Sequence, residues 1–532
     1  MLNSGSILFS ILLGTLLTML ASWGVAGLYR RRMVALMRGG PPPALASPDV
    51  SEPVATEESR SPASFDLASN QRASMRFLLV LSILCLLIGL TQSWLALQFV
   101  YVNREFSLNR ILVLGAVYAW PMVLAWGLAR RWSWMRVLGG VAIYMLVMAL
   151  LVMLRSNQQQ TLAGVSGWLA SQIAIPLLVT LFISASGRIR AVAPYLLPPF
   201  LLLSTSSVIA LNILEGTVQA PPGWIIMLVS NLGATPTIVL LALLPWVLMA
   251  WPVYVLVKRM AEAYRAKRFS DLAYLFGVYW FVVLFTSALS ALQEAGLLAL
   301  IQMLSWLWIP LGWYGLKDWL APRGKPPTLL VLRVFQRDAQ VEQLFDRVIE
   351  RWRHTGNTVL IAGTDLLSRT LDPDDLFAYF NGRLAERFVA SQGEMPKRLA
   401  ELDMAPDPDG RYRVNECYCF DTTWRAVLAA LVQKSDVVLM DLRGFKEKNA
   451  GCIHELGVLA RVPHLQRVVL LHDQDTERPV AEAALAGAPE GRFQWLDAGR
   501  MNQAMTTRVL AALFPTAASA RQTITRPEGS AP

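Results

Sequence analysis

The chain has 532 residues, of which 54% are hydrophobic and only 16% are charged, and its net charge is +10. Soluble domains usually carry about 25% charged residues, so a wholly soluble enzyme, a collagen-like fibre and a disordered protein are all excluded. Residues 1–325 contain 23 Lys+Arg against 11 Asp+Glu, whereas residues 326–532 contain 25 against 27, so we expect no nucleic acid as a partner of the second part.

The first part of the chain contains repeated apolar runs. A membrane-crossing helix needs about 20 mostly apolar residues. The sequence therefore predicts a multi-pass α-helical membrane bundle of about nine spans. These are Ile7–Leu28, Phe77–Gln98, Ile111–Leu128, Val137–Leu154, Trp168–Ser184, Val192–Leu214, a long run Trp224–Leu256, Leu272–Leu292 and Gly296–Leu316.

The long run over residues 224–256 has two interpretations. It is interrupted by prolines, and we interpret it as one span near Thr237–Leu256 that follows a half-inserted or surface segment. If it formed two spans, the orientation of everything after it would be reversed.

The charges between the spans predict the orientation. With nine spans and the N-terminus outside, 20 Lys and Arg residues fall on the inner side and three (Arg104, Arg110 and Arg155) on the outer side. This asymmetry is the one that the positive-inside rule describes. We therefore expect an integral protein of the cell's inner (plasma) membrane, with the lipid bilayer as a partner and the C-terminal part in the cytoplasm.

The segments beside the bundle differ in composition. Residues 1–29 predict an uncleaved transmembrane helix, because no Lys or Arg precedes Arg30 and the apolar stretch is longer than that of a signal peptide. Residues 30–76 are rich in Pro, Ser, Ala and Glu and predict a disordered cytoplasmic linker. The bundle then occupies residues 77–317.

No ionisable residue lies well inside the predicted spans, which argues against a proton- or ion-coupled transporter. Mildly polar residues and several prolines remain, so a transporter with a regulatory domain stays open as a third hypothesis.

Residues 326–515 alternate strand and helix patterns, which predicts an α/β domain with a mostly parallel sheet, and residues 516–532 predict a disordered tail. The expected strands are Thr328–Phe335, Thr358–Ala362, Tyr412–Phe420, Asp436–Asp441, Val468–Leu471 and Phe493–Leu496. The expected helices are Ala339–Thr355, Asp374–Phe388, Thr422–Val432, Gly451–Leu459 and Asn502–Leu513.

Ligands of parallel sheets bind beyond the carboxyl ends of the strands. The candidate ligand-binding residues follow from that position, and Trp424 is a candidate for stacking on a base. They are Arg337, Asp338, Gly363, Asp365, Trp424, Arg443, Asn449 and Gly451.

The most informative stretch is SDVVLMDLRGFKEKNAGCIHELGVLA, residues 435–460. A strand ends in Asp441, and Gly451 opens a helix that carries Glu455 one turn later. Gly451 would let a ligand approach the backbone, and Asn449 with the free helix amides would hold ribose or phosphate oxygens. Glu455 would stabilise or attack an oxocarbenium-like transition state, and Asp441 or Asp365 would bind ribose hydroxyls. The alternative is a structural role, in which Glu455 only interacts with the helix dipole.

This stretch resembles the TIR-like and nucleoside deoxyribosyltransferase-like Rossmannoid domains. The resemblance covers about residues 326–515, although its specific part is only some 25 residues. It implies that Glu455 acts on the glycosidic bond of a nucleoside or NAD, that Asp441 is the strand-end acid, and that Arg337 and Asp338 form the loop after the first strand. His454 precedes the acid where these families often carry an aromatic residue, and many TIR-like domains are silent assembly modules.

Two hypotheses follow for the function. In the first, the cytoplasmic domain binds a nucleotide or NAD and cleaves its N-glycosidic bond, as a glycosidase or transferase. In the second, a non-enzymatic membrane signalling or scaffold protein binds a nucleotide or a partner. Neither requires a resident cofactor, and a homo-oligomer is compatible with both. The four cysteines and four histidines do not form a ligand cluster, so we expect no metal site.

Overall fold

The computed structural model describes residues 4–39, 65–101, 106–155, 161–183, 187–216, 221–334, 338–362, 376–489 and 491–514, without 377, 380, 381 and 421. These residues divide into two compact units. The first, called the bundle here, contains Met1–Leu28 and Leu78–Leu316. The second, called the α/β unit, contains Tyr29–Phe77, Lys317–Arg369 and the chain from Asp375 onward.

Eight helical runs among the described residues are long and apolar enough to cross a membrane. The last of them, Asp271–Leu320, corresponds to two of the nine predicted spans, because the chain turns back at Gly296, where φ is +56°. α10 (Asp271–Ala295) then lies beside the 3₁₀-helix η3 (Gly296–Leu307), and the Trp306 indole N–H donates to the Gly277 carbonyl at 2.9 Å. α11 (Trp308–Leu320) follows.

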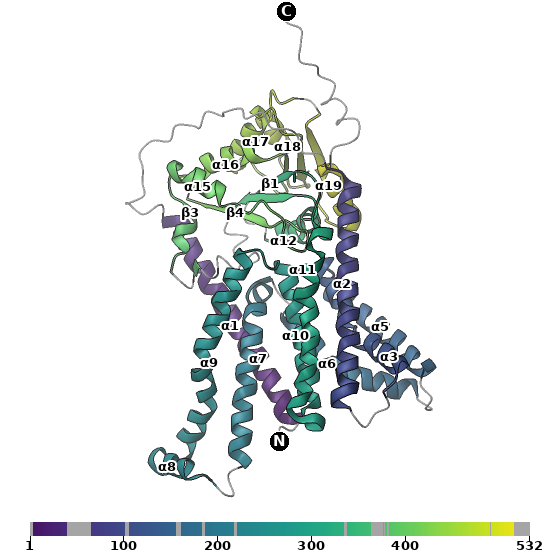
Figure 1. Cartoon of the computed structure of the whole chain (residues 1–532). Coiled ribbons are helices and arrows are strands. Elements are labelled where there is room, and N and C mark those ends of the chain that lie inside the picture. Colours follow the sequence, from purple (N-terminus) through teal and green to yellow (C-terminus); the bar gives the residue numbers. More distant parts are fainter. Residues whose placement is uncertain are drawn as a thin grey trace, which may run out of the picture. The chain divides into compact units, whose positions relative to one another are not determined.

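Figure 1 labels most of the other helices of the bundle and colours them by their position along the chain. In residues 224–256, Gly233 (φ +90°) separates a short apolar helix, which is not among the eight long apolar runs, from a long one, which is. The helices are α1 (Ser4–Gly39), α2 (Leu67–Leu95) with the π-helix η2 (Ala96–Val100), α3 (Leu108–Tyr118), α4 (Pro121–Ala129), α5 (Trp134–Arg155), α6 (Leu162–Ile183), α7 (Gly187–Gly216), α8 (Gly223–Leu232) and α9 (Ala234–Arg265).

Close approaches at small residues hold the bundle together. A Cβ atom on Gly89 would lie 2.4 Å from the Gly115 carbonyl oxygen, and one on Gly312 would lie 2.3 Å from the Leu84 side chain. Small residues at such crossings let backbones pack without side chains between them, as is usual for membrane helices. α10 is buried along most of its length and forms the centre of this packing.

The α/β unit contains a seven-stranded sheet in which every pair is parallel, with the order β3-β4-β2-β1-β5-β6-β7. All six predicted strands are present. The sequence did not predict β3, because two residues leave no periodic signal. The strands are β1 (Thr328–Arg333), β2 (Asn357–Ile361), β3 (Phe388–Val389), β4 (Val414–Cys419), β5 (Val437–Asp441), β6 (Arg467–His472) and β7 (Phe493–Asp497).

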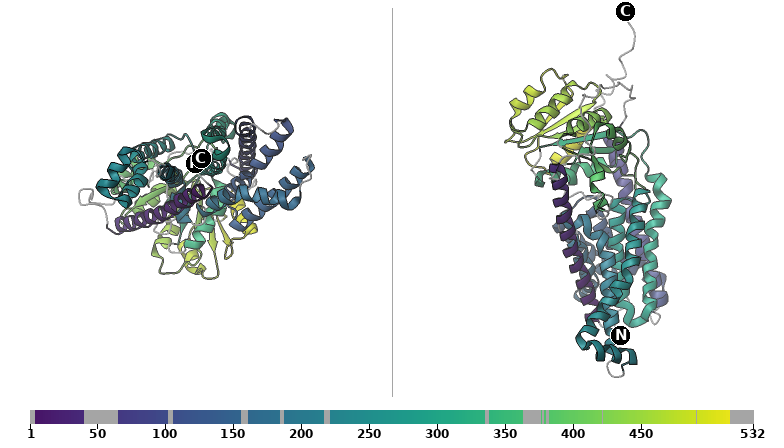
Figure 2. Two further views of the ribbon diagram at one scale, coloured as in Figure 1. Left: turned by 90° about the horizontal axis from the view of Figure 1, so that it is seen from below. Right: turned by 90° about the vertical axis from the view of Figure 1, so that its left-hand side faces the viewer.

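Helices cover both faces of this sheet, which is drawn in green to yellow in Figure 2. Alternate residues of β1 enter two separate cores: Leu330 and Leu332 pack with one set of helices, and Leu329 and Val331 with the other. This alternation is the reason why the buried strands are apolar throughout. The first core includes α16 (Trp424–Lys434), α17 (Ala450–Arg461) and α18 (Arg478–Ala484), and the second includes α12 (Asp338–Leu344), η4 (Phe345–Ile349), α13 (Glu350–Trp352) and α19 (Gln503–Leu513).

The predicted helix Asp374–Phe388 is confirmed only in part, because Leu376, Ala378 and Tyr379 are helical but the rest of the described segment is not α-helical. Leu384–Arg387 is a 3₁₀-helix and Phe388 begins β3. Phe388 packs against Phe420 and Tyr418, so contacts with the sheet outweigh the local helical pattern. The segment up to residue 410 also contains a short helix, α15 (Met395–Ala400), that was not predicted.

The first turns of α2 are part of the α/β unit. Asn70 is 4% exposed, and its amide donates to the Arg351 carbonyl and to the Thr355 hydroxyl, both at 2.7 Å. Phe77 is buried against the His354 ring, with 5.5 Å between ring centres. The predicted linker 30–76 is therefore helical at both of its described ends, and its centre, residues 40–64, lies outside the described residues.

Candidate functional site

The centre of the sheet is the point where the chain changes direction. β1 pairs with β2 on one side and with β5 on the other, so the connections that follow β1 and β5 leave in opposite directions. In an open parallel sheet this switch point leaves room for a ligand beyond the carboxyl ends of the strands. Arg333 and Asp441 are the last residues of these two strands and lie directly opposite each other in the register.

Asp441 and Arg443 form a closed ion pair at this point. The Asp441 carboxylate accepts hydrogen bonds from the Arg443 backbone N–H (3.2 Å), Nε (2.8 Å) and Nη2 (2.5 Å). Arg443 Nη2 also donates to the Gln340 carbonyl at 3.1 Å, and both charged side chains are buried. Two predicted site residues thus lie together, but Asp441 is already occupied by Arg443.

Glu455 lies one turn into α17 and is 5% exposed. Among the described residues, its Oε2 atom has no hydrogen-bond partner. Burial raises the pKa of Glu455 to about 8, while the charge of Arg333 acts in the opposite direction. At pH 7 the carboxyl group is therefore mostly protonated, which is unusual for a glutamate and typical of groups that perform acid or base chemistry.

Two neighbours of Glu455 were not among the predicted site residues. Arg333 is a buried cation at the end of an otherwise apolar strand, and that departure from the pattern TLLVLR was the signal available in the sequence. Cys452 lies one turn before Glu455, with Sγ 3.9 Å from the Arg333 carbonyl oxygen. Burial raises the pKa of this thiol, so it is not a reactive thiolate at pH 7.

The loop between β5 and α17 places two more predicted residues. Asn449 precedes the helix, but its side-chain oxygen accepts from the Lys446 N–H at 2.8 Å and makes no helix cap. A Cβ atom on Gly451 would meet nothing within 4 Å, so the space beside this residue is open. The start of α17 is therefore accessible for an incoming ligand, as far as the described residues show.

Trp424 is half-buried at the start of α16, and its indole lies edge-on to the His454 ring with 5.4 Å between centres. The remaining predicted residues are not placed: Arg337, Gly363 and Asp365 lie outside the described residues, and Asp338 begins α12 with its side chain outside them. Within the described chain, no group of three or more His, Cys, Asp or Glu residues could hold a metal ion.

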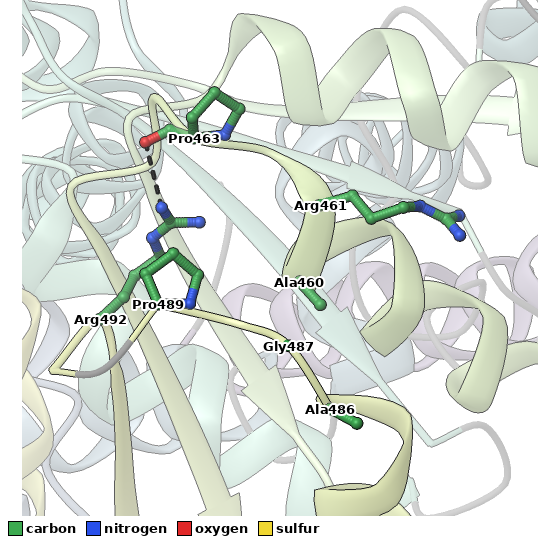
Figure 3. Close-up of a pocket in the computed structure, with 7 residues that line it drawn as sticks. All are labelled: Ala460, Arg461, Pro463, Ala486, Gly487, Pro489 and Arg492. Atoms are coloured by element: carbon green, nitrogen blue, oxygen red, sulfur yellow. Dashed lines mark hydrogen bonds between the residues drawn. The ribbon is translucent and has the colours of Figure 1, made fainter.

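A pocket of about 300 Å³ lies at the opposite edge of the sheet, near the amino ends of β6 and β7. Figure 3 shows its lining, with the guanidinium group of Arg492 directed at the Pro463 carbonyl. Arg492 donates to the carbonyls of Val462 and Pro463 and so satisfies backbone groups just after α17. That contact explains Arg492 as a structural residue.

No protein-family profile, curated protein or solved structure matches this chain. The resemblance to the TIR-like domains therefore stays a prediction.

Proposed function

We propose that the α/β unit binds a nucleotide or NAD beyond the carboxyl ends of β1 and β5, and that Glu455 acts on the N-glycosidic bond of that ligand. The observation that carries the proposal is Glu455 itself: a buried carboxyl group whose Oε2 has no partner among the described residues, at the switch point of a parallel sheet. Such a group is costly to bury and is used where a ligand completes its interactions.

A positively charged substrate would convert Glu455 from its protonated form to the carboxylate, and the proton would pass to solvent. The nicotinamide ring of NAD carries a positive charge, and an opposite charge nearby favours the ionised carboxylate. Cleavage breaks the bond between the ribose C1′ and the ring nitrogen, whose electron pair stays on the nitrogen, so neutral nicotinamide leaves. The Glu455 carboxylate then stabilises the ribosyl cation until water adds and releases a proton.

The location is part of the same proposal. The apolar helices of the bundle support embedding in a membrane. The predicted spans leave 20 Lys and Arg residues on the inner side and three on the outer side. This asymmetry supports a plasma-membrane protein with its N-terminus outside and its α/β unit in the cytoplasm, where NAD and nucleotides are found.

The test uses the full-length protein in lipid nanodiscs, incubated with NAD and with a set of nucleosides, and measures released base by chromatography. We expect release by the wild-type protein and a loss of about 100-fold or more in Glu455→Gln. Glu482→Gln is the matched control, because Glu482 is an exposed acid on α18 that pairs with the equally exposed Arg478. No release by the wild-type protein, or equal release by both variants, would refute the enzymatic proposal.

A non-enzymatic binding domain is the second candidate. It is favoured by the Asp441–Arg443 pair, because among the described residues Asp441 is then not a free carboxylate that could act together with Glu455. In that case calorimetry would detect NAD or nucleotide binding, and no base would be released.

A further inference from the structure

The bundle contains four buried, uncharged polar side chains on two of its helices. Gln92 and Ser93 lie on α2 and are fully buried, as is Ser305 on η3, and Gln302 on η3 is 2% exposed. Among the described residues, both amide atoms of Gln92 and the hydroxyl groups of Ser93 and Ser305 have no hydrogen-bond partner. Gln302 makes one long contact, from its amide nitrogen to the Ala299 carbonyl at 3.5 Å.

Two contacts show that these helices run side by side in opposite directions. At one end, the Trp308 indole N–H donates to the Thr91 hydroxyl at 2.8 Å. At the other end, Ala299 and Val100 belong to the same hydrophobic cluster. The segment 91–100 of α2 and η2 therefore lies along the segment 299–308 of η3 and α11.

The geometry of a 3₁₀-helix then places the polar groups. Side chains three residues apart share one face of such a helix, and the buried residues of η3 are Ala299, Gln302 and Ser305. Trp308 continues this face toward Thr91. Gln302 and Ser305 therefore lie on the buried side of η3, within the interval that runs along Gln92 and Ser93 of α2, and we call these four residues the polar layer.

The backbone beside the polar layer is irregular on both sides. α2 changes to a π-helix at Ala96, and η3 keeps 3₁₀ geometry for 12 residues, where three or four are usual. Short π-helical segments occur frequently at functional sites, and a 3₁₀ stretch within a helical run often marks a hinge or a strained sequence. They support a role for this part of the bundle beyond simple packing.

The chemistry of the polar layer defines what it would hold. Residues 77–100 and 296–316 contain no Asp, Glu, Lys, Arg or His, so nothing there would balance the charge of an ion. The amide of Gln92 both donates and accepts hydrogen bonds, and so do the serine hydroxyls. Buried polar groups in this state are usually satisfied by a bound molecule, of which water is the most frequent.

We propose that the polar layer binds a small uncharged molecule that donates and accepts hydrogen bonds, either ordered water or a neutral solute such as a polyol or an amide. The occupant lies between α2 and η3 and completes the hydrogen bonds of Gln92 and Ser305. This site is independent of the one at Glu455 and does not rest on the proposed enzymatic function.

The test is a cryo-electron-microscopy map of the full-length protein in lipid nanodiscs, prepared in buffer without polyols or amides, at a resolution that shows ordered water. We expect non-protein density within hydrogen-bond distance of Gln92 and Ser305, and its loss in Gln92→Leu. Gln98→Leu, an exposed glutamine on η2, is the matched control and should retain the density. Density of the size of water identifies water, and a larger feature identifies a co-purified solute, which mass spectrometry of the extracted protein would name.

Thermal stability gives a second readout. If the site is occupied, Gln92→Leu removes hydrogen bonds and should lower Tm relative to Gln98→Leu. If the polar layer is dry, leucine removes an unsatisfied amide and should raise Tm. A map without density, density that persists in Gln92→Leu, or a raised Tm would each overturn the proposal.

Discussion

The bundle and the α/β unit both bury polar side chains, but they satisfy them differently. The α/β unit buries charges in pairs: Arg411 contacts Asp409 at 3.0 Å and Glu350 at 3.1 Å, and Arg413 contacts Asp407 at 2.8 Å. The bundle buries uncharged groups, mostly bonded to backbone carbonyls, as Ser204 is to Ser10 at 2.8 Å. In both regions, a buried polar group that lacks such a partner among the described residues is therefore an exception. Glu455 and the polar layer are two such exceptions.

The largest expected effect comes from breaking a buried pair. Arg411→Met would remove the cation that contacts the buried Asp409, while Glu350 would keep its pair with Arg353, and breaking such a buried pair costs about 3–5 kcal/mol. Thermal unfolding of the full-length protein measures it. Arg383→Met, which breaks an exposed pair with Glu386, is the control and should leave Tm unchanged. An equal Tm for the two variants would show that burial does not decide the strength of these pairs.

The second prediction concerns the ionisation of the buried Glu455 carboxyl group. The pKa of Glu455 is about 8 in the folded chain and has its ordinary value of 4.5 in the unfolded chain. The folded state binds this proton more tightly, so the stability it contributes is complete below pH 4.5 and is lost as the pH rises to about 8. Each unit of difference corresponds to about 1.4 kcal/mol.

Unfolding by denaturant at pH 5 and pH 8 checks this prediction. The wild-type protein should lose more stability between these two values than Glu455→Gln, which cannot ionise. Parallel losses in the two proteins would mean that other groups cause the pH dependence.

The two regions differ in how much of their structure the sequence predicts. Run length and periodicity predicted the apolar helices and the six longer strands, because these patterns reflect burial directly. They also predicted that Asp441, Arg443 and Glu455 would lie near one edge of the sheet. They did not predict the ion pair between Arg443 and Asp441, because a hydrogen bond between side chains two residues apart leaves no periodic pattern in the sequence.

The irregular helices could not be predicted either. A π-helix at Ala96 and a long 3₁₀-helix from Gly296 have the composition of ordinary spans, and only the backbone hydrogen bonds distinguish them. The buried state of Gln92 and Ser305 depends on which helices become neighbours. The sequence showed these residues as mildly polar positions with no indication of their alignment.

A smaller effect is expected where α2 enters the α/β unit. Asn70→Ala removes two hydrogen bonds and leaves the Arg351 carbonyl without this donor, which should cost about 1–2 kcal/mol. The control is Gln71→Ala at the next, exposed position. A Tm as high as that of the control would show that the contact contributes nothing to stability.

The smallest expected effect is at Gly451. Its added methyl group would meet no described atom, so Gly451→Ala should stabilise α17 by about 0.5–1 kcal/mol. If a nucleotide or NAD approaches this backbone, calorimetry should at the same time show weaker binding of that ligand. Higher stability with unchanged affinity would place the ligand elsewhere on the unit.

The contact of α2 with the α/β unit has a practical consequence for expression. A fragment that starts at Pro326 omits Asn70 and Phe77. The Asn70 amide donates hydrogen bonds to Arg351 and Thr355, and the Phe77 ring packs against His354. Burial, together with the charge of Arg411, lowers the pKa of His354 to about 3, and exposing this ring to water would remove that effect. An autonomous version of the unit should therefore carry residues 65–77 as well, for example in a permuted gene that joins them to the C-terminus through a soluble spacer.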